Sequence, residues 1–282
     1  NPQPALAPSA PGIDAPPAAA AFRPDPTAQL TPSGDKARAR ANLAAIALSR
    51  RLAERGTPAT PDEQRRLAAW SSWGAIPGIF DESQHDWATE RAELRSQLSE
   101  REWRAASRTT INAHYTDPRL VDAIWRAARD LGLTAGRVLE PGCGAGTFIG
   151  LAPDTVAMTG IELDPVTARI ARALYPQATI RAESFADTDY STGSFDSAIG
   201  NVPFANVTLH DRRHNPNGHS LHNHFILKAI DLVRPGGLVA VLSSSFTLDA
   251  QNPGARLEMY AKADLFGALR LPNGTHRRTA GT

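Results

Sequence analysis

The sequence predicts an α/β fold in which a mostly parallel, doubly wound sheet follows a helical extension. From residue 118 onward, short apolar runs alternate with stretches of helical periodicity, a pattern typical of parallel strands joined by crossover helices. A glycine-rich turn follows the first apolar run, as in Rossmann-like folds, where ligands bind at the carboxyl ends of the strands. The chain has 282 residues, of which 41% are hydrophobic, enough for one sizeable core.

Composition divides the chain into three regions. Residues 1–33 are dominated by alanine and proline, which predicts a disordered tail or linker because few large apolar groups offset the entropy of ordering. Residues 34–110 are predicted to be a helical extension. The third region, 111–282, is predicted to be an α/β catalytic domain that is incomplete at its C-terminal end. Within the extension we expect helices over 35–54, from Pro61 onward and over 87–106.

The third region is expected to hold six strands and three helices. The expected helices are 120–131, 165–174 and 222–233. The expected strands are 137–140, 156–162, 179–181, 195–200, 238–243 and 268–271.

Net charge, cysteine content and the length of apolar runs exclude several classes of protein. The net charge is +1, so any nucleic-acid-binding surface must be a local patch. The single cysteine, Cys143, excludes a disulfide framework and fits a reducing, cytoplasmic location. No apolar run approaches the roughly 20 residues of a membrane span, and no signal peptide is evident.

The glycine-rich turn has the features of a cofactor site. Residues 139–146 read Leu-Glu-Pro-Gly-Cys-Gly-Ala-Gly, and glycines allow tight backbone next to a ligand. The acid before the turn, Glu140, suits a cofactor with a cationic amino-acid end better than a diphosphate. About twenty residues later Glu162 closes the second strand, where an acid can bind both hydroxyls of a ribose. We expect Asp164 to cap the next helix instead. A purely structural turn is the alternative.

A second motif closes the fourth expected strand. Its residues are Asn201, Val202, Pro203 and Phe204. Two acceptors, the Asn201 side-chain oxygen and the Val202 carbonyl, would draw a planar amine nitrogen toward tetrahedral geometry and free its lone pair in the transition state. Pro203 stiffens the loop, and Phe204 can stack on a base that is flipped out of a nucleic-acid duplex. As an isolated string, the tetrapeptide would more often be an ordinary turn.

In this order and spacing, the two motifs resemble those of S-adenosylmethionine-dependent methyltransferases that act on the N6 amine of adenine in DNA. More narrowly, the chain resembles the N-terminal part of large plasmid- and phage-borne DNA methylase–helicase fusion proteins. The matching segments are 73–74 (Trp-Gly), 80–81 (Phe-Asp), 113–116 (Ala-His-Tyr-Thr), 139–144, 162–165 (Glu-Leu-Asp-Pro), 200–204 (Gly-Asn-Val-Pro-Phe) and 270–273 (Arg-Leu-Pro-Asn).

The resemblance implies an adenine-specific DNA methyltransferase with S-adenosylmethionine as cofactor, DNA as partner and a helicase region in the same polypeptide. It also implies a role in restriction–modification or antirestriction. The catalytic residues would be those of the tetrapeptide. The cofactor-binding residues would be Tyr115, Thr116, Glu140, Gly142, Gly144, Glu162, Leu163, Ser184 and Phe185.

Other functions remain open. The same tetrapeptide chemistry could serve the amide of a protein glutamine or an RNA base amine. A non-catalytic module that positions DNA for a helicase is an alternative from another class.

Histidines and arginines suggest where DNA would lie. Five histidines between 210 and 224 match no common zinc spacing, so we expect no metal. Together with Arg212 and Arg213 they are expected to lie against DNA phosphates. If the arginines of the first two helices face the same groove, DNA binding should be weak, salt-sensitive and without sequence preference. The residues are His210, His214, His219, His222 and His224, and Arg38, Arg40, Arg50, Arg51, Arg65 and Arg66.

Overall fold

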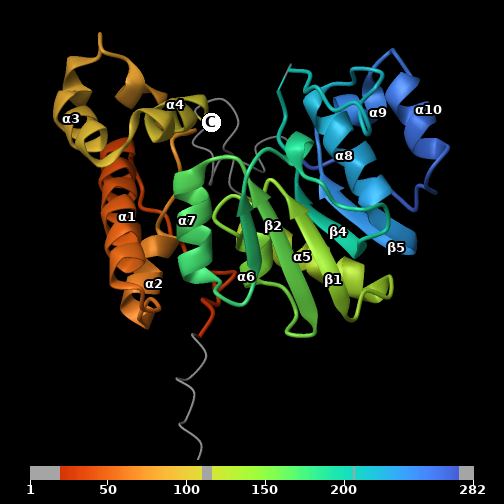
Figure 1. The fold of residues 1–282 in the computed structure, drawn as a ribbon, viewed down its shortest axis with the longest axis horizontal. Coiled ribbons are helices and arrows are strands. Elements are labelled where there is room, and N and C mark those ends of the chain that lie inside the picture. The colour runs from red at the N-terminus through yellow and green to blue at the C-terminus, as the bar shows by residue number, and fades with distance from the viewer. Residues whose placement is uncertain (1–19, 110–115, 206, 273–282) are drawn as a thin grey trace, which may run out of the picture.

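A single sheet of five parallel strands forms the centre of the molecule (Figure 1). The computed structural model describes residues 20–109, 116–205 and 207–272, and every statement below concerns these residues. The strands are β1 (Gly136–Pro141), β2 (Val156–Glu162), β3 (Thr179–Ala182), β4 (Phe195–Asn201) and β5 (Val233–Leu242). The predicted doubly wound α/β fold is confirmed.

Helices surround the sheet. The first part of the chain forms α1 (Asp35–Arg55), α2 (Pro61–Ala68), α3 (Ala88–Gln97) and α4 (Glu100–Thr109), with the short 3-10 turns η1 (Pro77–Phe80) and η2 (His85–Trp87) between α2 and α3. The α/β part adds α5 (Pro118–Asp130), α6 (Thr147–Gly150), α7 (Pro165–Leu174), η3 (Phe185–Asp187), α8 (Leu221–Leu232), α9 (Phe246–Asp249) and α10 (Gly254–Tyr260).

The two faces of the sheet belong to different apolar clusters. Val138 of β1 packs in the cluster that contains α5, α6 and α7, whereas its neighbour Leu139 packs in the cluster that contains α8. Successive side chains of a strand point to opposite faces, so this alternation shows that β1 is covered on both sides. Parallel strands of this kind therefore read as nearly continuous apolar runs, which made them recognisable in the sequence.

The strand order is β3-β2-β1-β4-β5. The chain moves outward from β1 to β3, then returns and continues from β4 to β5 on the other side of β1. The order therefore reverses between β1 and β4, and the carboxyl ends of strands at such a reversal form the usual ligand crevice of open α/β sheets.

The helical extension packs onto the sheet unit through α7. Both α1 and α2 contact α7 (Figure 1), and their apolar side chains join the same core as the sheet. Trp73 is fully buried and makes edge-to-face contacts with Trp70 and Phe80. The indole N–H of Trp70 donates to Thr167 Oγ1 on α7 at 3.2 Å. Apolar packing and this hydrogen bond thus attach the extension to α7.

Local capping explains two features of the extension. α2 begins at Pro61, as the sequence predicted. Thr60 and Glu63 add a capping box before it that the sequence analysis did not anticipate. The single helix expected over 87–106 is instead two helices. The backbone N–H of Ser99 donates to Glu102 Oε2 at 2.9 Å, and Ser99 Oγ accepts from the Glu102 N–H at 3.3 Å. This capping box begins a new helix and ends the old one.

Two further expectations differ from the structure. The strand predicted at 268–271 is wrong, because these residues form no strand and Leu269 is 94% exposed. Residues 20–27 are attached to the fold, although they fall in the region expected to be a tail. The Phe22 N–H donates to the Leu174 carbonyl at 2.9 Å, and Arg23 donates to the Ala152 carbonyl at 2.7 Å. The contacts of Phe22 and Arg23 offset the loss of conformational entropy on ordering, which the alanine and proline residues around them cannot offset.

Candidate functional site

The glycine turn leaves the end of β1 and is held against β2. Gly142, Gly144 and Gly146 have φ angles of +73°, +54° and +88°, which strain any residue with a Cβ. A Cβ on Gly146 would lie 2.7 Å from the Tyr175 ring, so packing requires that glycine. The Glu162 carboxylate accepts from the Gly144 N–H at 2.9 Å, which ties the turn to the end of β2.

Two acidic side chains, Glu140 and Glu162, lie next to this turn. Glu140 is 2% exposed, and its Oε2 has no hydrogen-bond partner within the described part of the chain. Burial, and then the nearby charge of Glu162, raise the pKa of Glu140 well above its usual value. Burial likewise raises the pKa of Glu162 to about 7, against hydrogen bonds from the N–H groups of Asp164 and Gly144. A cationic group bound here would favour both ionised forms.

The target tetrapeptide lies next to the glycine turn because β1 and β4 are neighbours. A Cβ on Gly200 would lie 3.2 Å from Cγ of Glu140, and a Cβ on Gly142 would lie 3.5 Å from Cδ of Pro203. The Val202 N–H donates to the Leu242 carbonyl of β5 at 3.1 Å, and the Val202 side chain is buried. Asn201 is therefore fixed at the end of β4, beside the turn. The structure thus brings together the two motifs, which are more than fifty residues apart in the sequence.

Sequence reasoning missed Phe225 on α8. A Cβ on Gly142 would lie 3.7 Å from Cε1 of this ring, so Phe225, like Pro203, packs against the turn at Gly142. The only signal in the sequence was an aromatic residue inside an apolar helix, and most such residues are ordinary core residues.

Four of the remaining predicted cofactor residues lie in the described part of the chain. Thr116 is buried just before α5, and Leu163 is 64% exposed after β2. The Ser184 hydroxyl caps η3 by accepting from the Ala186 N–H at 3.2 Å. Phe185 is buried, with its ring centroid 4.8 Å from that of Phe225. Tyr115 lies outside the described residues. The roles of these residues in binding stay predictions.

Two other sequence inferences concern residues beside the turn. Asp164 caps α7, because its carboxylate accepts from the N–H groups of Val166 and Thr167, as predicted. Cys143 is buried, and burial raises the pKa of its thiol well above the ordinary value. A thiol that stays protonated is a poor nucleophile, so Cys143 acts as a small packed side chain of the turn.

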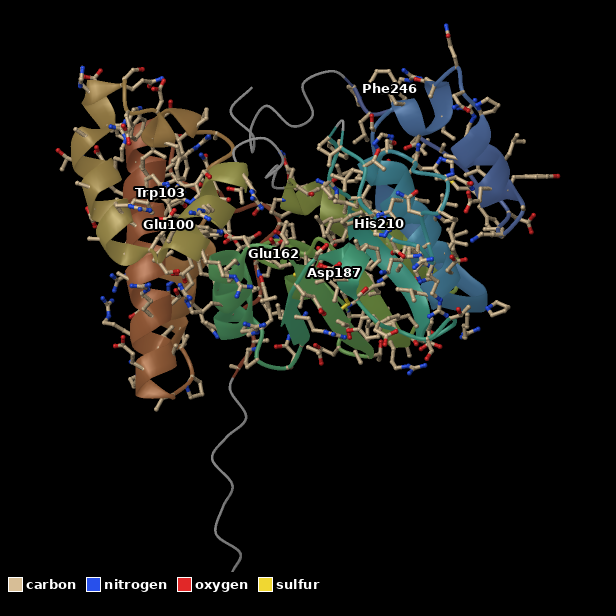
Figure 2. All side chains as sticks on the ribbon, turned by 45° about the horizontal axis from the view of Figure 1, so that its top comes forward. Glu100, Trp103, Glu162, Asp187, His210 and Phe246 are labelled. Carbon is tan, nitrogen blue, oxygen red and sulfur yellow. The ribbon has the colours of Figure 1, made fainter. Side chains whose placement is uncertain are left out.

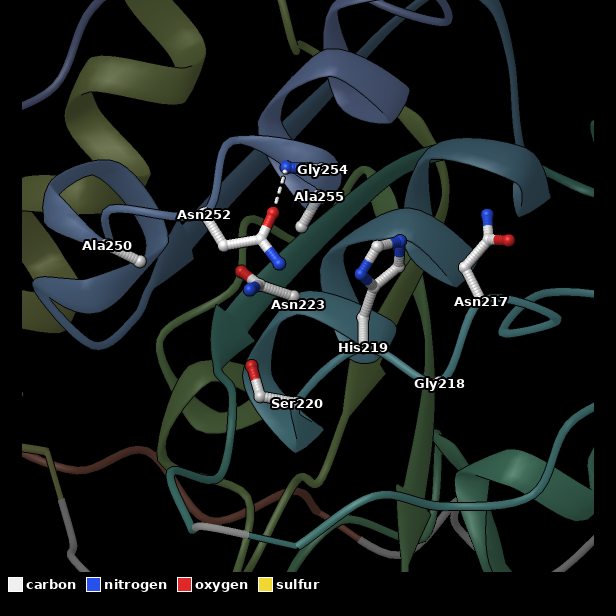
Figure 3. Close-up of a pocket in the computed structure, with 9 residues that line it drawn as sticks. All are labelled: Asn217, Gly218, His219, Ser220, Asn223, Ala250, Asn252, Gly254 and Ala255. Atoms are coloured by element: carbon white, nitrogen blue, oxygen red, sulfur yellow. Dashed lines mark hydrogen bonds between the residues drawn. The ribbon is translucent and has the colours of Figure 1, made fainter.

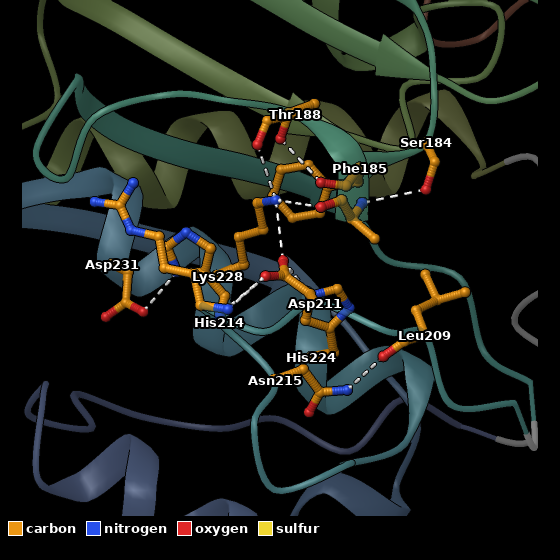
Figure 4. Close-up of polar contacts among 12 residues, drawn as sticks. Ser184, Phe185, Thr188, Leu209, Asp211, His214, Asn215, His224, Lys228 and Asp231 are labelled. Carbon is orange, nitrogen blue, oxygen red and sulfur yellow. Dashed lines mark hydrogen bonds and ion pairs between the residues drawn. The ribbon is translucent and has the colours of Figure 1, made fainter.

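Three of the five histidines after the tetrapeptide, His214, His222 and His224, are buried, and Figure 4 shows His214 and His224 beside Asp231 and Asp211. Within the described residues, no group of histidine, cysteine or acidic side chains could hold a metal. Three histidines each contact a carboxylate instead. These pairs are His214 Nδ1 with Asp231 Oδ2 at 2.9 Å, His219 Nε2 with Glu258 Oε2 at 2.9 Å, and His224 Nε2 with Asp211 Oδ2 at 3.1 Å.

These pairs change the expected DNA surface. His214, His222 and His224 are buried, so the expectation that all five histidines lie against phosphates is wrong. His210, Arg212 and Arg213 are exposed and can still do so. The carboxylate partners come from the segment itself, α8 and α10, a proximity that histidine spacing cannot reveal.

The arginines of the extension lie far from Arg212 and Arg213. Figures 1 and 2 show α1–α4, with Glu100 and Trp103, at one end of the molecule and His210 at the other, with Glu162 between them. Arg50 and Arg65 are also paired with acids of the extension, Arg50 with Glu102 at 3.3 Å and Arg65 with Asp62. A groove that both arginine groups line would have to run the length of the molecule.

A hollow of about 500 Å³ lies between the segment before α8 and the helices α9 and α10 (Figure 3). Polar side chains line it, among them Asn217, His219, Asn223 and Asn252. None of its lining residues belongs to the glycine turn or the tetrapeptide, so this hollow is separate from the candidate catalytic site.

The fold and this site together define a Rossmann-like α/β protein whose glycine turn meets a second loop at the reversal of the strand order. No family model matches the chain. Over 248 residues the chain is 27% identical to the Defense against restriction protein B of Escherichia phage P1. The match covers 86% of this chain and 10% of the phage protein, so the chain spans about a tenth of that relative.

Solved structures of similar architecture include proteins described as methyltransferases. One is a class I S-adenosylmethionine-dependent methyltransferase of Listeria monocytogenes, with 14% identity, a TM-score of 0.44, and coverage of 80% of this chain and 79% of that chain. Another is an RNA methyltransferase of Pyrococcus horikoshii, with 15% identity, a TM-score of 0.35, and coverage of 48% and 63%. At such low identities and TM-scores, the activities of these two proteins are not evidence for the activity of this chain.

Proposed function

We propose that this chain is an S-adenosylmethionine-dependent methyltransferase domain that acts on the N6 amine of adenine in DNA. The observation that carries the proposal is the contact between the two motifs. The position of a Cβ on Gly142 is 3.5 Å from Pro203, so a cofactor over the turn and an acceptor at Asn201 would be neighbours. The relationship to a phage protein named for defence against restriction favours DNA as the acceptor.

The acids of the turn fit this cofactor. The buried Glu140, with an oxygen that no described group satisfies, would bind the ammonium of the amino-acid end, because an unpaired buried carboxylate is costly without a cation. Glu162 would bind the ribose hydroxyls through the lone pairs that its two backbone contacts leave available. When bound, S-adenosylmethionine supplies a methyl group on a positively charged sulfur.

The tetrapeptide would prepare the acceptor. The Asn201 side-chain oxygen and the Val202 carbonyl would accept the two N6 hydrogens, which favours the tetrahedral nitrogen of the transition state over the planar nitrogen of free adenine. The Val202 N–H donates to the Leu242 carbonyl of β5. This hydrogen bond restrains the backbone at Val202 and thereby the position of the Val202 carbonyl. Phe204, which is half-buried, would stack on the extruded base.

The wider biological setting is also proposed. A helicase region in the same polypeptide rests on the sequence resemblance alone. A role in restriction–modification or antirestriction is supported by that resemblance and by the name of the phage relative. Within the described residues, no helix is long and apolar enough to cross a membrane.

The test is transfer of a radiolabelled methyl group to DNA, RNA and protein acceptors in parallel. We expect label in DNA, at N6 of adenine, and loss of roughly a hundred- to a thousand-fold in rate in Asn201→Ala with cofactor affinity preserved. Label only in RNA or in glutamine amides would overturn the acceptor assignment. Cofactor binding without any transfer would favour the non-catalytic DNA-positioning role.

A further inference from the structure

Lys228 on α8 is a buried cation that neither motif uses. It is 1% exposed, and its Nζ donates to the Ala186 carbonyl at 3.0 Å, the Thr188 carbonyl at 3.2 Å and Asp211 Oδ2 at 3.1 Å (Figure 4). An ammonium has three N–H donors, and these three contacts use all of them. The fully paired charge can therefore remain in a site that excludes water.

The three acceptors come from two different parts of the site. Ala186 lies in η3 and Thr188 follows it. They come directly after Ser184 and Phe185, which the sequence resemblance places among the cofactor-binding residues. The Lys228 ammonium also lies 5.1 Å from the centroid of the Phe185 ring. Asp211 lies instead in the segment 207–220, which follows the target tetrapeptide. One side chain thus joins the segment on the cofactor side to the segment on the acceptor side.

Asp211 is itself held in place from its own segment and from α8. It accepts from the backbone N–H groups of Arg213 at 3.1 Å and His214 at 3.0 Å, and it contacts His224 Nε2 at 3.1 Å. Burial raises the pKa of Asp211, but the hydrogen bonds from His214, His224 and Lys228 outweigh it and hold the pKa below its ordinary value. A movement of segment 207–220 must therefore break a charged, buried contact with Lys228.

We propose that Lys228 is a positioning residue that joins residues 185–188 and the acceptor segment 207–220 into one unit. Ligand-induced ordering at the first segment then also orders the second. The ligand part of this inference rests on the proposed function, whereas the joining of the two segments does not.

The residue type supports a specific geometric role. Only three of the 30 basic residues of this chain are lysines, yet lysine occupies this buried position. A lysine ammonium directs three donors tetrahedrally from one atom, whereas arginine presents a planar fork. Lys228→Arg therefore keeps the charge and changes the geometry, and Lys228→Met keeps an unbranched chain and removes the charge.

The first measurement needs no ligand. Backbone hydrogen exchange of the full chain should become at least tenfold faster in both 185–188 and 207–220 in Lys228→Met. Lys262→Met is the matched control, because Lys262 is 32% exposed and contacts Asp231 rather than the cofactor-side segment; it should leave 185–188 at the wild-type rate. Unchanged exchange in either segment of Lys228→Met would overturn the proposal.

The second measurement tests transmission. S-adenosylmethionine should slow exchange in 207–220 of the wild type several-fold, and this slowing should be lost in Lys228→Met and Asp211→Asn while protection of the glycine turn persists. Retained slowing in both variants would refute the coupling. If Lys228→Met does not fold, hydrogen exchange with and without cofactor is measured in Lys228→Arg and Asp211→Asn instead. Absence of cofactor binding by the wild type would refute the proposed function, and the ligand-free result would still decide whether Lys228 joins the segments.

Discussion

If Glu162 binds the cofactor ribose as proposed, its raised pKa should make cofactor affinity depend on pH. Because burial raises this pKa to about 7, roughly nine-tenths of the carboxyl groups are protonated at pH 6, and about nine-tenths are ionised at pH 8. Ribose hydroxyls donate more strongly to a carboxylate than to a carboxylic acid, and a cationic ligand also favours the ionised form. The ligand therefore binds the ionised state better, and affinity should rise with pH up to about 7 and then level off.

The magnitude follows from linkage. If the bound ligand returns the Glu162 pKa to its ordinary value of 4.5, affinity should rise about tenfold between pH 6 and pH 8, since each unit of pH below the raised pKa is worth about 1.4 kcal/mol. At pH 6 the binding reaction should release about one proton.

The stability of the ligand-free protein should change in the opposite direction. A carboxyl whose pKa is raised on folding stabilises the folded state fully below the unfolded pKa, near 4.5, and that contribution is lost as the pH rises through 7.

Calorimetry at pH 6, 7 and 8, in buffers with different heats of ionisation, measures both the affinity and the proton release. Glu162→Gln should bind weakly at every pH and lose its share of the pH dependence. Glu140→Gln is the companion variant, because the pKa of Glu140 is raised as well. Equal affinity at pH 6 and 8 in the wild type, without proton release, would refute the reasoning.

Three further changes test other parts of the structure. Trp73→Ala should lower the free energy of unfolding by about 3–5 kcal/mol, because Trp73 is fully buried and truncation leaves a cavity; Phe246→Ala, at a side chain 66% exposed, should change it by less than about 0.5 kcal/mol in the same denaturant titration. Phe204→Ala should weaken binding of DNA with an extruded adenine by about 1–3 kcal/mol in fluorescence anisotropy, and an unchanged affinity would exclude stacking. Arg212→Ala and Arg213→Ala should each lower the salt dependence of DNA binding by about one phosphate contact, and an unaltered slope would remove these exposed side chains from the interface.

Local chemistry made much of the fold predictable. The bounds of β2 and α7 are those expected, because an apolar run ends at Glu162 and a capping acid stands before Pro165. By contrast, the helix expected over 87–106 is divided at Ser99. Helical periodicity continues across a break when the second helix has its own cap, so periodicity alone does not locate the boundary.

The strand expected at 268–271 shows a different limit. Its apolar residues satisfy the composition of a strand, but a strand also needs a neighbour that completes its hydrogen bonds and a face that is buried. Leu269 has neither a strand pairing nor burial in the described structure. These conditions depend on other parts of the molecule and cannot be read from four residues.

The class of fold, the glycine turn and the tetrapeptide could be predicted from the sequence, because each depends on residue types that are close together in the chain. The folded structure was needed to show that β4 lies beside β1 and so brings Pro203 next to Gly142. It was also needed to show that three of the histidines contact carboxylates and that Lys228 contacts both residues 186–188 and Asp211. Contacts between groups distant in sequence depend on the order of strands and on which face of a helix is buried. A buried charge reveals its partner only when the folded chain has brought the two together.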